Sequence, residues 1–249
     1  MAVARRRVRV GLAAAARRRA SGALAALAVM AAVNGAAPPP APAQDTVEQD
    51  TAAQDARAVE IMERTAARYA GVKTLCADFE QDLEVPLLGE ERRGRGRMCQ
   101  ARPDRFAMRF TDPPGDAVVV DGTWVWIYYP SLDSTQVIRL PMERRPGGFD
   151  FHREFLERPA RRYTMSYLGE EKVDGRATHH IRLVPRAETS YQTAEVWIEK
   201  ESLLLRRVRI AEENGSVRTV TFTRVELDPA VPDAWFTFTP PAGAQVISG

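Results

Sequence analysis

Histidine and cysteine are scarce in this sequence, which has three and two of them among 249 residues. His179 and His180 are adjacent, and adjacent strand residues point to opposite faces, so the pair is poorly placed to hold one metal ion. The Gly-x-Ser-x-Gly elbow of hydrolases and a phosphate-cradling glycine loop are both missing. Carboxylate pairs such as Glu170–Glu171 stand at expected turns. These absences argue against an enzyme and give no reason to expect a cofactor or a metal ion.

The only long apolar run, residues 21–33, is too short to span a membrane, because a helical span needs about 20 residues. It follows an arginine-rich start and precedes Ala41-Pro42-Ala43, whose small residues are typical of a cleavage site. These features predict a secretory signal peptide over residues 1–43. We expect a flexible linker at 44–53 and a single domain at 54–249. Neither cysteine directly follows the cleavage site, so we expect a soluble exported protein without a lipid anchor.

Excess positive charge is also missing once the leader is removed. Seven of the 35 basic residues precede residue 20, whereas all 33 acidic residues follow residue 43, so the mature chain carries a net charge of −5. Binding to nucleic acid is driven by basic surfaces, so this balance argues against a nucleic-acid partner.

The pattern of apolar residues predicts one helix followed by a large sheet. Val59, Met62, Ala66 and Tyr69 recur at helical spacing within residues 54–70. Later residues alternate with period two between turn signals. A short helical piece is expected at 150–157, and eleven strands are expected at about 75–85, 90–102, 105–111, 116–121, 123–130, 134–140, 161–169, 177–184, 191–200, 203–211 and 216–227. A sheet of this size should curl into a barrel or half-barrel.

The first hairpin places the two cysteines opposite each other. A four-residue loop at Pro86–Gly89 makes Val85 face Glu90, and the same register makes Cys76 face Cys99. Facing residues of neighbouring strands lie within disulfide reach, and an oxidising compartment favours the bond. Because Cys76 alternates with the apolar face of its strand, the predicted disulfide lies on the outer face of the sheet; two free thiols are the alternative.

Aromatic and apolar residues are more abundant than one helix can cover. Phe79 and Leu83 share a face of the first strand, and Phe106, Met108 and Phe110 share a face of the third. Trp126 and Tyr128 share a face of the strand DGTWVWIYYP, both of whose faces are apolar. Such a surplus is explained either by an ordinary core or by an apolar cavity, and large apolar concavities are usually binding sites.

Four segments together resemble the periplasmic outer-membrane lipoprotein carrier family, LolA. They are ADFEQDL (Ala77–Leu83), GRGRMCQARPDRFAMRFTDPPGD (Gly94–Asp116), DGTWVWIYYP (Asp121–Pro130) and DAWFTFTPPAGAQV (Asp233–Val246). The resemblance implies a mainly β fold: an incompletely closed antiparallel half-barrel of about eleven strands, with a long N-terminal helix and a short lid helix over an apolar cavity.

The resemblance also implies roles for individual residues. Arg102 matches the family arginine that bonds to the lid at the cavity mouth and serves as a gate. Phe106 matches a phenylalanine at the cavity rim, and Trp126 and Tyr128 match a Trp-x-Tyr pair that would line the cavity. Phe238 belongs to the matching tail, which is structural. We therefore expect the following lipid-binding and gate residues: Arg102, Phe79, Leu83, Phe106, Met108, Phe110, Trp126 and Tyr128.

This sequence departs from the family pattern in three places. Met108 stands where the family often has tryptophan, and the cysteine pair is not a usual family feature. The segment between Leu140 and Arg161, where the family places lid helices, is short and rich in arginine, proline and glycine.

The function that the resemblance implies is that of a periplasmic chaperone without enzymatic activity or cofactor. A monomer would accept acylated lipoproteins from an ATP-driven releasing complex of the inner membrane, shield their acyl chains and pass them to an outer-membrane acceptor. Two alternatives remain: an envelope carrier of another lipid, and a lipid- or lipoprotein-binding sensor module.

Overall fold

The computed structural model describes residues 44–142 and 152–249, which belong to one compact unit. The predicted signal peptide and residues 143–151 lie outside the described residues. Among the described residues, none of the helices combines the length and the apolar character that crossing a bilayer requires.

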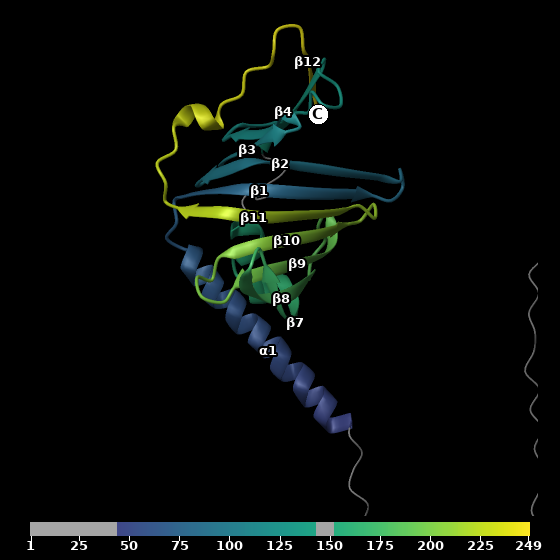
Figure 1. The fold of residues 1–249 in the computed structure, drawn as a ribbon, viewed down its shortest axis with the longest axis vertical. Coiled ribbons are helices and arrows are strands. Elements are labelled where there is room, and N and C mark those ends of the chain that lie inside the picture. Colours follow the sequence, from purple (N-terminus) through teal and green to yellow (C-terminus); the bar gives the residue numbers. More distant parts are fainter. Residues whose placement is uncertain (1–43, 143–151) are drawn as a thin grey trace, which may run out of the picture. The chain divides into compact units, whose positions relative to one another are not determined.

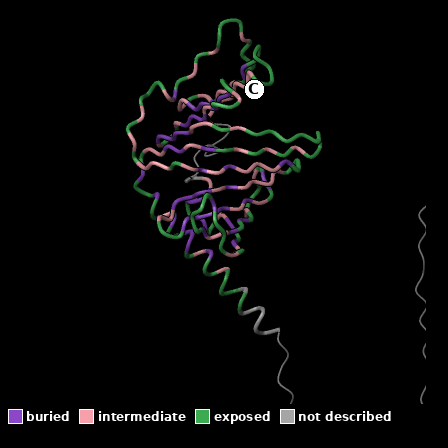
Figure 2. Tube along the Cα trace, viewed as in Figure 1, coloured by how far each residue is buried: buried purple, intermediate pink, exposed green. Residues whose placement is uncertain are grey.

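The first element is the helix α1, Gln44–Tyr69. It begins ten residues before the predicted start, so the expectation of a flexible linker at 44–53 is wrong. Those residues contain no proline or glycine that would interrupt a helix, and many are good helix formers. The buried stripe, with Ala58, Met62 and Tyr69, belongs to the C-terminal half of α1 (Figures 1 and 2). This half packs against the strand β7 (Tyr163–Val173) and the short helices η2 (His152–Leu156) and α2 (Pro159–Arg162).

The strands form one twelve-stranded sheet in the order β12-β6-β5-β4-β3-β2-β1-β11-β10-β9-β8-β7 (Figure 1). All neighbours are antiparallel except β12 and β6, which are parallel. The strands are β1 Thr74–Val85, β2 Glu90–Ala101, β3 Arg105–Asp112, β4 Pro114–Asp121, β5 Trp124–Tyr128, β6 Gln136–Pro141, β7 Tyr163–Val173, β8 Arg176–Pro185, β9 Tyr191–Glu199, β10 Leu205–Glu212, β11 Val217–Leu227 and β12 Gln245–Ser248.

The prediction of a mainly β, incompletely closed sheet is confirmed, since β12 and β7 remain as its two edges. The eleven predicted strands are present, and the prediction missed β12, which has only four residues. Short helices complete the described fold: η2 at His152–Leu156, α2 at Pro159–Arg162 and η3 at Asp233–Phe236. The helix η2 lies within the predicted helical piece.

Each face of the sheet carries an apolar cluster. The inner cluster joins the buried stripe of α1 and η2 to the strands, and it contains Phe79, Val125 and Phe222. The outer cluster is smaller and surrounds Cys76, Cys99 and Phe236, the last of which belongs to η3. The chain after β11 therefore returns over the outer face and covers it.

These two clusters explain why β5 is apolar on both faces. Val125 is fully buried in the inner cluster, and Ile127 packs against that cluster. On the opposite face, Trp126 and Tyr128 stand 5.7 and 5.8 Å from the ring of Phe238, which lies in the returning C-terminal segment. Both faces of the strand are thus covered by protein.

Candidate functional site

A pocket of about 40 Å³ lies on the inner face, where α1 ends and the sheet begins. Its walls come from the α1–β1 connection, from β1, β2, β10 and β11, and from η2. The lining residues are Tyr69, Val72, Lys73, Thr74, Leu75, Ala77, Met98, Gln100, Arg102, Leu156, Leu205, Phe222 and Val225. Ligand pockets usually measure about 300–1,000 Å³. This pocket is much smaller and has room for only a few water molecules.

Arg102 holds the end of α1 over this pocket. Its two terminal guanidinium nitrogens donate hydrogen bonds to the carbonyl oxygens of Tyr69 and Ala70, each at 3.1 Å. The last carbonyls of a helix have no partner within the helix, and the helix dipole favours a cation there. Arg102 thus lines the pocket and bonds to the end of α1, and its role as a gate stays a prediction.

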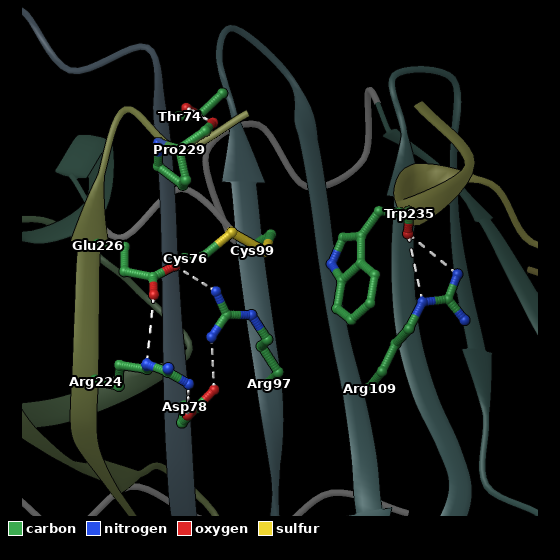
Figure 3. Close-up of a disulfide and its surroundings, with 10 residues drawn as sticks. All are labelled: Thr74, Cys76, Asp78, Arg97, Cys99, Arg109, Arg224, Glu226, Pro229 and Trp235. Atoms are coloured by element: carbon green, nitrogen blue, oxygen red, sulfur yellow. Dashed lines mark hydrogen bonds and ion pairs between the residues drawn. A yellow bond between two sulfur atoms is a disulfide. The ribbon is translucent and has the colours of Figure 1, made fainter. Parts of the chain in front are cut away.

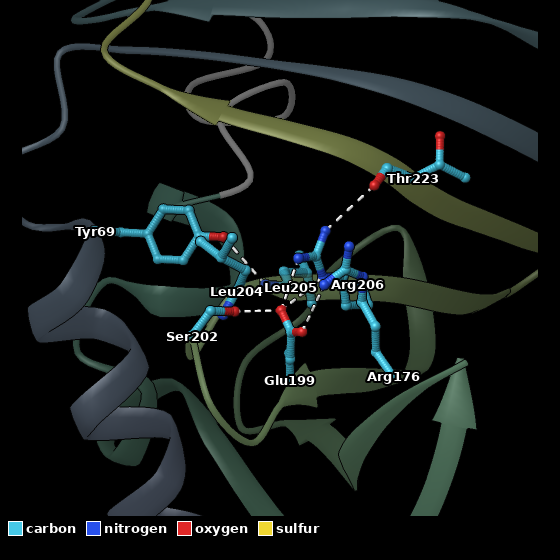
Figure 4. Close-up of polar contacts among 8 residues, drawn as sticks. All are labelled: Tyr69, Arg176, Glu199, Ser202, Leu204, Leu205, Arg206 and Thr223. Carbon is cyan, nitrogen blue, oxygen red and sulfur yellow. Dashed lines mark hydrogen bonds and ion pairs between the residues drawn. The ribbon is translucent and has the colours of Figure 1, made fainter. Parts of the chain in front are cut away.

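A network of polar side chains holds the connection between β9 and β10, to which the end of α1 is hydrogen-bonded (Figure 4). The hydroxyl of Tyr69 accepts a hydrogen bond from the backbone N–H of Leu205, at 3.1 Å. At the end of β9, Glu199 accepts hydrogen bonds from Arg206, at 2.6 and 3.0 Å, and from Ser202. Burial opposes ionisation, but the bonds from Ser202, Arg206 and Arg176 outweigh it and lower the pKa of Glu199 to about 2.

The helix η2 is anchored by a second buried group. Tyr191 donates a hydrogen bond to the carboxylate of Glu154 at 2.5 Å, and Tyr163 donates one to the backbone carbonyl of Glu154 at 2.7 Å. Burial is the main cause that raises the pKa of both hydroxyls, for Tyr163 to about 12, so both stay protonated as donors. This anchor places Leu156 in the pocket wall.

The aromatic residues expected to bind lipid do not all stand in this pocket. Phe79, Phe106, Met108 and Phe110 belong to the inner cluster, on the predicted face, but they do not line the pocket. Phe79 and Phe110 pack edge to face at 5.0 Å. Leu83 is half-buried near the free end of the β1–β2 hairpin, in neither apolar cluster. The three phenylalanines and Met108 thus belong to the packed apolar core of the inner face, outside the pocket lining.

The expectation that Trp126 and Tyr128 line the cavity is wrong. Both lie on the outer face against Phe238, and the indole nitrogen of Trp126 donates to Asp121 at 2.8 Å. Alternation correctly grouped these residues on one face, but a strand that is apolar on both sides gives no sign of which face is inner. The residues of β5 that face inward are the alternate ones, such as Val125.

The predicted disulfide is present and joins β1 to β2 (Figure 3). Cys76 pairs with Cys99 in the expected register. The bridge is on the outer face as predicted, although it is buried there. The residues that flank the two cysteines line the pocket from the other face of the same strands: Leu75, Ala77, Met98 and Gln100.

Sequence reasoning missed the residues that build most of the pocket. Gln100, Leu205 and Val225 lie at strand ends close to turns, where alternation is weakest as a guide. Gln100 had one usable signal, since it stands two residues before Arg102 and therefore on the same face of the chain.

The site combines mostly apolar walls with polar side chains near its mouth, where Arg102 is hydrogen-bonded to the end of α1. No group of three or more histidine, cysteine or acidic side chains in the described part of the chain could hold a metal ion. The pocket offers apolar walls, two cations at its mouth (Lys73 and Arg102) and one buried amide, Gln100.

Comparisons with a family model and with individual proteins point to the same family. A family model described as outer membrane lipoprotein carrier protein LolA matches residues 70–239. The outer-membrane lipoprotein carrier protein of Chromobacterium violaceum is 27% identical over 187 residues, covering 74% of this chain and 85% of the relative. The corresponding protein of Methylibium petroleiphilum is 29% identical over 185 residues, covering 72% and 85%.

Solved structures of low identity are also similar. An uncharacterized conserved protein from Thermus thermophilus has a TM-score of 0.49 at 16% identity, covering 78% of this chain and 99% of that chain. A LolA superfamily protein from Nitrosomonas europaea has a TM-score of 0.36 at 15% identity, covering 73% and 97%. Because the family model matches well over half of its residues, this chain belongs to the outer-membrane lipoprotein carrier family, LolA.

Proposed function

We propose that this protein is a carrier exported to the periplasm, where as a monomer it receives acylated lipoproteins from an ATP-driven releasing complex of the inner membrane. It shields their acyl chains on the inner face of the sheet and passes the lipoproteins to an outer-membrane acceptor. Its family membership and the apolar pocket support this role.

One observation supports the proposal most directly, the clamp that Arg102 makes on the last turn of α1 above an apolar pocket. Two hydrogen bonds from the half-buried guanidinium of Arg102 to backbone carbonyls can be broken at modest cost, because even a bond that involves a charged group has a net value of only about 1.5–3 kcal/mol. The clamp can therefore open when the free energy that a ligand gains by burying its apolar surface exceeds the cost of breaking these two hydrogen bonds.

The size of the pocket makes such opening necessary. A space of about 40 Å³ cannot receive an acyl chain unless the α1–β1 connection or η2 moves away from the sheet. Each methylene that is buried gains about 0.8 kcal/mol. The work of opening subtracts from this gain, so binding stays reversible, as onward transfer requires.

The test is release of lipoproteins from inner membranes. The mature protein, added with ATP and the releasing complex, is expected to draw acylated lipoproteins into a soluble one-to-one complex. The variant Arg102→Leu should still load, because the apolar walls are intact, but it should fail to pass its cargo on to outer membranes. The matched control Arg93→Leu changes an exposed arginine of β2 and should behave as the wild type.

Two results would count against the proposal. If no soluble complex forms under conditions in which an established carrier works, the cargo is not a lipoprotein. If Arg102→Leu loads and delivers at the wild-type rate, the clamp has no part in transfer.

A further inference from the structure

Gln100 is an amide in a wall that is otherwise apolar at its depth. It stands on the inner face of β2 with 7% of its surface exposed, and it lines the pocket beside Leu75 and Met98. Its cross-strand neighbours are Leu75 on β1 and Phe106 on β3. No feature of the sheet requires a polar side chain at this position.

Among the described residues, the amide of Gln100 has no protein hydrogen-bond partner, unlike Glu199 and Arg206 nearby. Its polar atoms are not among the described side-chain atoms that are both shut off from solvent and unpaired, so the amide opens onto the pocket and is satisfied there by water. A ligand that displaces this water must replace the lost hydrogen bond, because leaving a buried polar side chain unpaired is costly. An unpaired amide on a pocket wall is therefore expected to find its partner in whatever fills the pocket.

Polarity falls steadily from the mouth of the pocket inward along β2. Arg102, just after the strand, is half-buried at the mouth, Gln100 is one step deeper on the same face, and Met98 is only 1% exposed. Each step of two residues along a strand covers about 6.6 Å. The wall thus presents a cation, then an amide, then apolar surface.

A second buried donor stands in the same pocket. The hydroxyl of Tyr69 accepts the bond from Leu205, but its own proton has no acceptor among the residues that the structure describes. Burial raises the pKa of this hydroxyl, so it keeps that proton. Both groups suit a ligand that carries a carbonyl oxygen just before its apolar part.

We propose that Gln100 donates a hydrogen bond to the carbonyl oxygen of the ester or amide that links an acyl chain to its head group, and so selects acyl lipids over ether-linked or plain hydrocarbon chains. This inference rests on the proposed function, and it deepens it by naming the chemical bond that is recognised. Tyr69 is placed to assist as a second donor.

The test compares two synthetic ligands that differ only in the carbonyl. One is a lipopeptide with two ester-linked chains on its glyceryl-cysteine, and the other is the dialkyl ether with chains of equal length. Affinities are measured by displacement of an apolar fluorescent dye from the mature protein. The wild type is expected to prefer the ester by about tenfold, the effect of pairing one buried polar group.

The variant Gln100→Met keeps the length of the side chain and removes the amide. It is expected to bind the two ligands equally, mainly by gaining affinity for the ether. The matched control Gln81→Met replaces a glutamine of β1 that lies on the same face of the sheet as Gln100 but outside the pocket. It should keep the preference of about tenfold. A role of Gln100 in folding alone would not change the ratio of the two affinities.

The outcomes separate this inference from the proposed function. Failure of the wild type to bind either ligand overturns both. Equal binding of ester and ether by the wild type overturns the role of Gln100 and leaves the carrier function standing. Preservation of the preference in Gln100→Met, checked with Gln100→Leu as a second variant, also overturns that role, since the carbonyl is then recognised elsewhere.

Discussion

At the scale of single residues, the charges that matter most are those that hold the pocket in shape. Glu199 and Arg206 each expose 7% of their side chains and face each other at 2.6 Å. A buried pair of this kind is costly to break because the remaining charge is left without compensation. Their role is to fix the turn between β9 and β10, whose Leu205 holds Tyr69 and with it the end of α1.

The lowered pKa of Glu199 predicts a loss of stability in acid. An acid whose pKa is lower in the folded state stabilises the fold above its unfolded pKa, and this contribution is lost as the pH falls. The pKa of Glu199 falls from an ordinary value of about 4.3 to about 2 in the folded state, so its contribution is lost as the pH falls from about 5 towards 2.

Urea unfolding at a series of pH values measures this contribution. Glu199→Gln is expected to be less stable than the wild type at pH 7 and to show a flatter dependence on pH below 5. Glu213→Gln, an exposed residue of the β10–β11 turn, serves as the control and should follow the wild type. Parallel curves for wild type and Glu199→Gln would contradict the assignment.

At the scale of elements, the returning C-terminal segment stabilises the outer face of the sheet. Arg109 on β3 donates a hydrogen bond to the backbone carbonyl of Trp235 at 3.1 Å (Figure 3). It donates another to the backbone carbonyl of Thr237 at 2.8 Å. Phe236 enters the outer cluster with 2% of its surface exposed. The segment thus covers the outer face as α1 covers part of the inner face.

Replacing Phe236 by alanine should therefore destabilise the fold without affecting lipid binding. Removing a fully buried phenylalanine costs about 3–5 kcal/mol, which denaturant titration will detect as a lower midpoint. The half-buried Phe238 gives a smaller loss when it is changed to alanine. A loss below about 1 kcal/mol for Phe236→Ala, or weaker binding of acyl ligands by the folded variant, would show that the two faces are not separate in function.

The sequence was sufficient to predict the elements and the contacts within a hairpin, but not the contacts between elements that are distant in the sequence. Alternation indicated the strands, and the hairpin register placed Cys76 opposite Cys99, because both depend on local geometry. The position of Trp126 could not be predicted, since it depends on Phe238, which is distant in the sequence. Arg102 was identified only by family resemblance. Gln100 could be recognised only once the structure placed it on the pocket wall without a protein partner among the described residues.

At the scale of the whole described unit, the helices and the sheet are packed closely together and leave only a small pocket. The inner cluster joins α1 and η2 to the sheet continuously, and the pocket is a small gap at one end of it. On the proposed function, acyl chains would therefore take the place of protein contacts, so that loading exchanges one apolar packing for another. The sheet has its own disulfide and outer cover, so the helices are the part that is free to yield.

This exchange predicts faster hydrogen exchange in α1 when lipid is bound. The amides of the last two turns of α1 and of Val72 should lose protection on loading, because the bonds from Arg102 are broken, while β9 and β10 stay protected. Hydrogen exchange with mass spectrometry, on empty and loaded protein, measures both regions in one experiment. Equal or greater protection of α1 in the loaded protein would mean that the chains bind without moving the helix.

The disulfide behind the pocket has a mechanical consequence. Cys76 and Cys99 tie β1 to β2 at the height of the pocket, so this wall cannot spread. Any widening of the sheet must fall on another seam, and the one between β1 and β11 already shifts register between Ala77 and Phe79. On the proposed function, the sheet side of the pocket can therefore widen only where β1 meets β11, while the helices move away above it. The extent of these two movements limits the bulk of the cargo that fits.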